Sequence, residues 1–312
     1  MHAAAHPGEA AIPFHGSRRE MPSRSETPNK GGPQYGYTVS TRVTPRADGP
    51  ALEIVETTPD GPRIGAPLLL LHGAFGGAWM WAEHLGPYLA RRGRASLAVS
   101  LRGHGASEGR DRLREITLDD YLADARFALD LLPQSPVVVG HSLGGLLAQR
   151  LVGRARMRGL ALVCSLPPEG LALVNARTAL TEPVVWLDAF VGATAPEATA
   201  MTAGSRHLLF SEGLPAARVR RYAALMTPEA PRALSQAHMP GPILSAFLTR
   251  LPTLVIGAAQ DRLVWRACTL RTAFYHAARH ETLDPAGHFP MLDVSADALG
   301  RKLVAWLEAE GL

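Results

Sequence analysis

The sequence predicts an α/β protein whose mainly parallel sheet has helices on both faces. Short apolar runs alternate with longer amphipathic segments through residues 35–165 and again over 251–312. Within the first region, residues 136–152 read as a β-branched strand that passes through glycines into a helix. Residues 166–250 break the alternation, because they are rich in proline and show several short helical patterns but no convincing strand. Such a segment is too long for a loop, so we expect a helical cap inserted into the core.

Each expected element follows from a local pattern. Polar and apolar residues alternate on both sides of Asp48-Gly49-Pro50, which predicts an antiparallel hairpin. Continuous apolar runs predict buried strands, and apolar residues three or four positions apart predict amphipathic helices. Thr117 to Asp120 resembles a helix-capping start. The expected strands are 35–46, 51–57, 67–71, 94–101, 137–139, 160–165, 252–257 and 279–283, and the expected helices are 77–92, 117–132, 146–152, 264–278 and 295–310.

Composition limits the class of protein. The 312 residues are 46% hydrophobic and 19% charged, which fits one α/β core with an insertion. The net charge is +4, but the arginines are scattered among alanine and acidic residues, which disfavours a nucleic-acid surface. No run of about 18 apolar residues is present, so we expect no membrane-spanning segment. Cys164 and Cys268 form no disulfide framework, and Cys164 reads as a small core residue, which fits a reducing, cytoplasmic setting.

The N-terminal residues differ from the rest of the chain. Residues 1–34 are rich in Pro, Gly, Ser, Arg and His and have almost no periodic apolar pattern, which predicts a disordered tail. They contain no apolar stretch of the kind found in a secretory signal. The predicted organisation is therefore a tail over 1–34, a core made of 35–165 and 251–312, and a cap over 166–250.

The stretch around Ser142 predicts nucleophilic chemistry. Residues 140–144 read Gly-His-Ser-Leu-Gly, a Gly-x-Ser-x-Gly pattern that lies between an apolar strand and a helical pattern. Five residues can match by chance in a glycine-rich chain, but this strand-turn-helix context is the one that makes a serine a nucleophile. The turn lifts the Ser142 hydroxyl out of the sheet. It also places the Leu143 amide at a helix N-terminus, where a developing negative charge is stabilised.

With Gly-His-Ser-Leu-Gly-Gly at its centre, the chain resembles the α/β-hydrolase superfamily, in particular its serine esterases and lysophospholipase-like members. The resemblance covers about residues 65–165 and 250–310, and the cap has no match. It implies a catalytic triad in the chain order serine, acid, histidine. His288 lies in a turn-rich Gly-His-Phe-Pro stretch after the last expected strand and resembles the family's catalytic histidine, the base for Ser142.

The resemblance also implies an acid partner for His288. Asp261 directly follows the strand 252–257, as the family's acid usually does, and would fix the tautomer of the imidazole and stabilise the imidazolium. Aspartate also caps helices well, so Asp261 is consistent with a cap for the helix expected near Leu263, alone or in addition. Glu169, after the preceding strand, is the alternative acid, because some family members use that position.

Residues 72–77, His-Gly-Ala-Phe-Gly-Gly, end the strand 67–71 and resemble the family's oxyanion loop. The resemblance implies that two backbone amides bind the tetrahedral oxyanion, one from Leu143 and one from this loop. Ala74 is the expected loop donor, and Phe75 is the neighbouring alternative. We expect His72 to be structural and to tie loops together.

These residues predict a serine hydrolase that cleaves a carboxylic ester through an acyl-enzyme on Ser142. The apolar content of the cap favours an apolar acyl or alcohol group, as in lysophospholipases and carboxylesterases. The same triad would serve an acyltransferase or a perhydrolase, and a non-catalytic ligand-binding member of the fold is a third hypothesis. Serine as nucleophile argues against dehalogenase and epoxide-hydrolase chemistry. No dinucleotide, zincin or paired-cysteine motif is present, so we expect no cofactor and a small-molecule ester as the partner, with the oligomeric state left open.

Overall fold

The computed structural model describes residues 34–170, 172–184, 187 and 208–312. Apart from Gln34, the tail predicted over residues 1–34 lies outside the described residues, so its disorder stays a prediction. The boundaries expected between core and cap also stay predictions.

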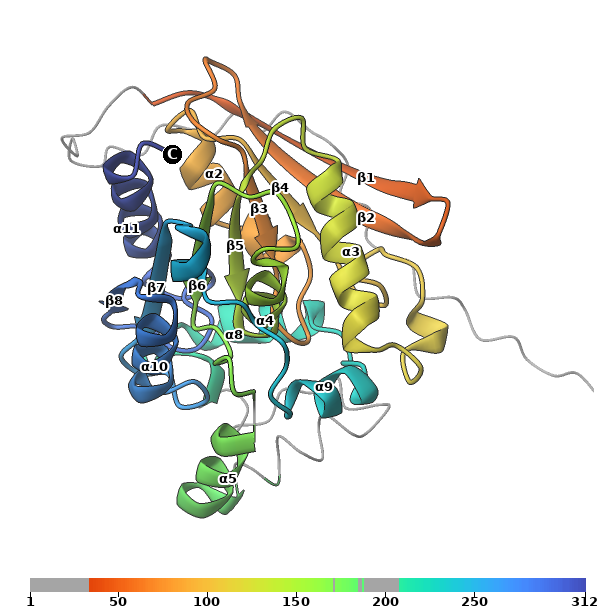
Figure 1. Ribbon diagram of the computed structural model, residues 1–312, viewed down its shortest axis with the longest axis vertical. Coiled ribbons are helices and arrows are strands. Elements are labelled where there is room, and N and C mark those ends of the chain that lie inside the picture. The colour runs from red at the N-terminus through yellow and green to blue at the C-terminus, as the bar shows by residue number, and fades with distance from the viewer. Residues whose placement is uncertain (1–33, 171, 185–186, 188–207) are drawn as a thin grey trace, which may run out of the picture.

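An eight-stranded sheet runs through the described part of the chain, in the order β1-β2-β4-β3-β5-β6-β7-β8 (Figure 1). β1 and β2 form the antiparallel hairpin that the sequence predicts, and β2 joins β4 antiparallel. All pairings from β4 to β8 are parallel, which confirms the mainly parallel α/β sheet. The strands are β1 (Tyr37–Arg46), β2 (Gly49–Pro59), β3 (Leu68–Leu71), β4 (Ser96–Val99), β5 (Val137–His141), β6 (Gly159–Val163), β7 (Thr253–Ala258) and β8 (Arg279–Leu283).

The inner strands, from β4 to β7 in the sheet, are buried along their whole length. Because such strands are covered on both faces, their sequences are mostly continuous apolar runs rather than alternating patterns. The edge strands β1 and β8 leave much of their surface exposed or half-buried. The loops that leave the carboxyl ends of the inner strands therefore start from a rigid base, which is where open α/β sheets place their ligand sites.

Helices cover both faces of this sheet (Figure 1). Buried residues of α3, α4 and α10 contribute to one apolar core, and those of α1, α2 and α11 contribute to the other. α3 begins with the expected cap, since the Thr117 side chain accepts from the Asp120 amide and the Asp120 carboxylate accepts from the Thr117 amide. The helices are α1 (Trp79–Ala82), α2 (Leu85–Ala90), α3 (Leu118–Asp130), α4 (Ser142–Leu151), α10 (Arg266–His276) and α11 (Ala296–Ala309), with a 3-10 turn η1 (Arg110–Arg112).

The described residues between β6 and β7 form helices and no strand, as the sequence predicts. They are α5 (Ala172–Thr181), α8 (Ala216–Leu225), α9 (Pro231–Ala237) and the 3-10 turn η2 (Ala246–Thr249). Figure 1 shows α8 and α9 at one end of the sheet, with α5 standing apart beyond the same end. That these helices act as a cap over a site stays a prediction. In the part of the chain that the structure describes, no helix is both long and apolar enough to cross a membrane.

Candidate active site

Ser142 lies at the junction of β5 and α4 in a conformation that residues with side chains seldom adopt. Its φ is 50°, and it begins α4 directly after His141 ends β5. Glycine at position 144 makes this turn possible. A Cβ on Gly144 would lie 2.4 Å from the carbonyl oxygens of both Leu71 and His72, so a larger residue would push α4 away from β3. The tight turn presents the Ser142 side chain at the carboxyl end of β5.

Ser142, His288 and Asp261 form one buried chain of hydrogen bonds. Ser142 Oγ lies 3.0 Å from His288 Nε2, and His288 Nδ1 lies 2.9 Å from Asp261 Oδ2. Ser142 and Asp261 are each 5% exposed, and His288 is 1% exposed. Because an ionised carboxylate only accepts, His288 donates its Nδ1–H to Asp261, which leaves the Nε2 lone pair to accept the Ser142 hydroxyl proton. The structure thus brings together three residues that lie in separate loops of the sequence.

Asp261 has a second set of donors. Its Oδ1 accepts the backbone N–H groups of Leu263 and Val264 at 2.9 and 2.8 Å. α10 begins beyond this turn, and no side chain caps its first residues. The alternative in which Asp261 caps this helix is therefore wrong. The carboxylate stabilises the turn before the helix instead. Glu169, the alternative acid, pairs with Arg271 at 2.7 Å. The carboxylate that meets His288 is that of Asp261.

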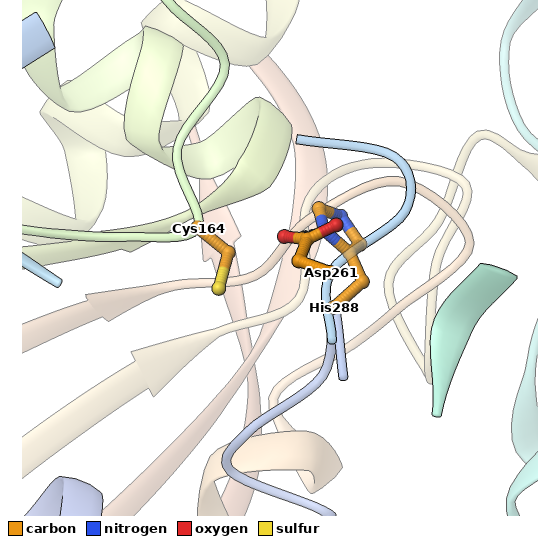
Figure 2. A group of neighbouring side chains, drawn as sticks. All are labelled: Cys164, Asp261 and His288. Atoms are coloured by element: carbon orange, nitrogen blue, oxygen red, sulfur yellow. Dashed lines mark hydrogen bonds and ion pairs between the residues drawn. The ribbon is translucent and has the colours of Figure 1, made fainter. Parts of the chain in front are cut away.

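Cys164 lies beside this carboxylate (Figure 2). It directly follows β6, is fully buried and has a φ of 43°. Figure 2 shows its side chain near those of Asp261 and His288, which come from the loops after β7 and β8. Burial and the nearby Asp261 carboxylate raise the pKa of Cys164 well above its ordinary value. The thiol is therefore protonated beside Asp261, a position beyond the core role that the sequence predicts.

The same three side chains are the one group of metal-ligating type found among the described residues, with donor atoms within 4.8 Å of one another. A metal ion held by these side chains would compete with Asp261 and Ser142 for the ring nitrogens of His288, both of which already have hydrogen-bond partners. The geometry therefore favours a hydrogen-bonded triad over a metal centre.

The loop after β3 lies against Ser142. A Cβ on Gly73 would be only 2.9 Å from the Cβ of Ser142. The Gly76 N–H donates to the Gly73 carbonyl at 3.2 Å and closes a turn in which Phe75 has a φ of 64°. The Phe75 N–H donates to the Glu229 carboxylate at 3.1 Å.

These contacts distinguish between the backbone N–H groups that could bind an oxyanion. The Leu143 N–H lies in the first turn of α4, where backbone N–H groups have no partner within the helix. The Ala74 N–H finds no acceptor among the described residues, whereas the N–H of Phe75 is engaged by Glu229. The geometry therefore favours Ala74 over Phe75 as the partner of Leu143.

His72 and His141 hold the loops around the triad. His72 Nε2 accepts the Leu101 N–H at 3.0 Å, and its Nδ1–H donates to the Gly73 carbonyl at 2.8 Å, which fits the structural role expected of it. Burial lowers the pKa of His72 to about 3, so the ring is neutral. His141 donates its Nε2–H to the His288 carbonyl at 2.8 Å, and burial lowers its pKa well below the usual value.

Sequence reasoning missed three contributors to this site: Cys164, His141 and Glu229. Cys164 follows an apolar run that reads as a strand, but its place beside Asp261 depends on the pairing of β6 with β7, which the sequence did not predict. His141 had a signal, because it directly precedes Ser142 in the Gly-x-Ser-x-Gly pattern. Glu229 had none, because it lies in a segment without a regular pattern and contacts a residue 154 positions away.

Comparisons with known proteins agree with this architecture. A family model described as alpha/beta hydrolase fold matches residues 66–294. A solved hydrolase from Pseudomonas aeruginosa PA01 is similar, with a TM-score of 0.63, 24% identity and coverage of 86% of this chain and 98% of that one. The esterase EaEST from Exiguobacterium antarcticum gives a TM-score of 0.62 at 17% identity, covering 84% and 97%. A haloalkane dehalogenase loop variant, DbeA-M1 from Bradyrhizobium elkanii, gives 0.62 at 19%, covering 88% and 97%.

Likeness at these identities shows the fold alone. Because the similar structures include both an esterase and a dehalogenase, the reaction has to be argued from the site. The comparison with curated proteins found no match.

Proposed function

Because the chain belongs to the α/β-hydrolase fold family, we propose that it is a serine hydrolase that cleaves a carboxylic ester through an acyl-enzyme on Ser142. The observation that carries the proposal is the buried hydrogen-bonded chain from Asp261 through His288 to Ser142. A serine hydroxyl is a weak nucleophile without a neighbouring base, and here the base is in contact and has its own carboxylate partner.

In the first half of the proposed reaction, Ser142 Oγ attacks the acyl carbon while its proton moves to His288 Nε2. The carbonyl oxygen becomes an oxyanion, which the N–H groups of Leu143 and Ala74 stabilise. Asp261 holds the imidazole in the required tautomer and stabilises the imidazolium. Collapse of the tetrahedral intermediate expels the alcohol, which takes the proton from His288 and leaves Ser142 acylated.

In the second half, His288 Nε2 takes a proton from water, and the resulting hydroxide attacks the acyl carbon. The second tetrahedral intermediate uses the same two N–H groups. When it collapses, Ser142 Oγ leaves and recovers its proton from His288. The acid is released and the enzyme returns to its starting state, so no cofactor is needed to balance the reaction.

The surroundings of the triad support an apolar acyl or alcohol group in the substrate, as in carboxylesterases and lysophospholipases. Two aromatic side chains from the segment between β6 and β7, Phe210 and Tyr222, pack near the catalytic loops. The Phe210 ring centroid lies 5.7 Å from that of Phe289, the neighbour of His288. The Tyr222 ring stacks on Trp79, which follows the oxyanion loop, at 6.1 Å. An apolar group next to these rings would gain by leaving water.

A fluorophosphonate probe tests the nucleophile. It should label the folded wild type at Ser142, and Ser142→Ala should abolish both labelling and turnover of an acyl ester, because losing a triad member typically costs several orders of magnitude. The exposed Ser235 on α9 provides the control, so Ser235→Ala should label like the wild type. Labelling that persists in Ser142→Ala would reject the assignment.

Acyl esters of graded chain length, assayed with and without an added alcohol, test the substrate and the acceptor. Hydrolysis that rises with chain length is expected. Product ester formed in preference to free acid would identify an acyltransferase instead. Labelling without turnover of any ester would favour a ligand-binding member of the fold.

A further inference from the structure

A buried carboxylate from the segment between α8 and α9 reaches the oxyanion loop. Glu229 is 2% exposed. Its Oε1 accepts the Tyr121 O–H at 2.5 Å and the Ala230 N–H at 2.7 Å. Its Oε2 accepts the Phe75 N–H at 3.1 Å and lies 3.3 Å from His104 Nε2, an ion-pair contact outside good hydrogen-bond alignment. Donors therefore surround both oxygens, which is the environment of an ionised carboxylate.

The contacts of the two ring nitrogens also indicate the charge of His104. His104 Nδ1 lies 3.2 Å from the Arg102 carbonyl, which can only accept, while its Nε2 faces the Glu229 carboxylate. Both ring nitrogens of His104 thus carry protons. Burial by itself would raise the pKa of Glu229, but the nearby charge of His104 and the hydrogen bonds from Tyr121 and Ala230 outweigh burial and lower it to about 2. Burial would lower the pKa of His104, and Glu229 reverses this and raises it.

We propose that Glu229 is a positioning residue that fixes the oxyanion loop in the conformation needed for catalysis. Residues 227–229 hold both main-chain groups of Phe75, because the Thr227 N–H donates to the Phe75 carbonyl at 3.1 Å and the Phe75 N–H donates to Glu229. Phe75 needs this support, since its φ of 64° lies in a region that residues other than glycine rarely adopt.

The position of Phe75 matters because Ala74 precedes it in the same turn. Turning the Phe75 peptide would change the backbone angles of Ala74 and redirect the N–H assigned to the oxyanion. Oxyanion donors work only within a narrow range of distance and direction. This inference rests on the proposed function, because it gives Glu229 a role only if Ala74 stabilises an oxyanion. A segment outside the strand-helix core would then set the geometry of a donor inside it.

Glu229→Gln is the sharpest test, because its amide has about the same shape as the carboxylate. The amide oxygen is best directed at Tyr121 and Ala230, and the amide NH₂ at His104, which then becomes neutral and accepts through Nε2. This arrangement satisfies every partner except the Phe75 N–H, which faces an amide N–H in place of an oxygen. The variant therefore loses the hydrogen bond to the Phe75 N–H but keeps the contacts with Tyr121, Ala230 and His104.

Two measurements report on the oxyanion directly: kcat on an ester, per titrated active site, and affinity for a boronic acid that forms a tetrahedral adduct with Ser142. We expect Glu229→Gln to lower kcat by at least about tenfold, since complete loss of one oxyanion donor costs about 10²–10³. The boronic acid should bind more weakly by a similar factor, and KM should change little. Tyr121→Phe, which removes one donor from Glu229, should produce a smaller drop in the same direction.

Glu281→Gln is the matched control, because Glu281 is also ion-paired, with Lys302 and Arg279, but lies on the edge strand β8. It should leave kcat and boronic acid affinity unchanged. Wild-type kcat and affinity in folded Glu229→Gln would overturn the proposal, and so would an equal loss in Glu281→Gln. If Glu229→Gln does not fold, wild-type values in Tyr121→Phe overturn it. Failure of the proposed function is separate, because it would appear as undiminished turnover in Ser142→Ala.

Discussion

Asp261 uses its two oxygens for different purposes, and this allows its role to be tested by a single atom change. Oδ1 accepts two backbone N–H groups, and Oδ2 faces His288 Nδ1. In Asp261→Asn the amide oxygen should stay with the backbone donors, so the amide NH₂ faces His288. His288 must then accept at Nδ1 and donate at Nε2, which is the wrong tautomer for a base. The corresponding change in a serine protease lowers turnover about 10⁴-fold.

Kinetics and thermal unfolding of Asp261→Asn and Glu169→Gln check this prediction. Asp261→Asn should lose most of its turnover and little stability, because the turn keeps its acceptor. Glu169→Gln loses an ion pair with Arg271 that is partly exposed, so it should change stability by less than about 1 kcal/mol and leave turnover alone. Full activity in Asp261→Asn would contradict the assigned role, and the reverse pattern would make Glu169 the acid.

At the scale of residues, the site residues that could be predicted are those that lie in a recognisable local sequence pattern. Ser142 has its strand-turn-helix context, and Asp261 and His288 have loops directly after expected strands. Glu229 has no such context. Its contacts with Phe75 and Tyr121 join residues 154 and 108 positions apart, and they exist only once the chain has folded. The resemblance alone favoured Ala74 over Phe75, and the physical reason, the Phe75 N–H bound by Glu229, appears only in the structure.

At the scale of elements, the packing of α4 on β3 depends on one glycine. A Cβ on Gly144 would meet two backbone oxygens at 2.4 Å, and backbone cannot move aside as a flexible side chain can. Gly144→Ala should therefore destabilise the fold by about 1–3 kcal/mol or more, the usual cost of overpacking. Turnover should also fall, because α4 carries Ser142 and Leu143.

Gly213→Ala is the control, since its added Cβ would meet its nearest neighbours at 3.8 Å. It should be neutral or stabilise by about 0.4–1 kcal/mol through the unfolded state. Urea unfolding and ester turnover of both variants provide the comparison. Equal effects at the two positions would show that contact with β3 does not set the requirement for glycine.

Two buried carboxylates connect the segment between β6 and β7 to the loops that carry Phe75 and His288. Glu229 holds Phe75 in the oxyanion loop. Asp293, from the loop before α11, accepts the Ser211 N–H at 2.8 Å and the Gly287 N–H at 2.9 Å, so it ties that segment to the neighbour of His288. The sequence predicted helices in this segment from its apolar spacing. Its attachments could not be predicted, because they depend on single polar residues whose partners are remote in the sequence.

At the scale of the whole molecule, alternating apolar runs and amphipathic patterns predicted the parallel sheet and the helices on both faces. Local periodicity suffices for this, because the spacing of apolar residues within each strand or helix indicates which of its faces is buried. The order of the strands was not predicted. β4 lies between β2 and β3, and that neighbourhood is fixed by pairing between strands that are separated along the chain.

Burial of neutral histidines should make the stability of the whole fold depend on pH. His276, 2% exposed on α10, accepts the Ala246 N–H through Nδ1 at 3.0 Å and donates through Nε2 to Gln149 Oε1 at 3.1 Å. Its neutral form thus joins η2, α10 and α4. Burial lowers the pKa of His276 from 6.5 to about 4.

Between these two pKa values the unfolded chain binds a proton at position 276 that the folded protein does not. Stability from this group is therefore present above about pH 6.5 and is lost as the pH falls through about 4, by up to about 3 kcal/mol. His276→Gln keeps an acceptor for Ala246 and a donor for Gln149 but cannot titrate. Urea unfolding at pH 7, 6 and 5 should show a smaller loss of stability on acidification in His276→Gln than in the wild type. Parallel curves would mean that His276 is protonated in the folded protein as readily as in the unfolded chain.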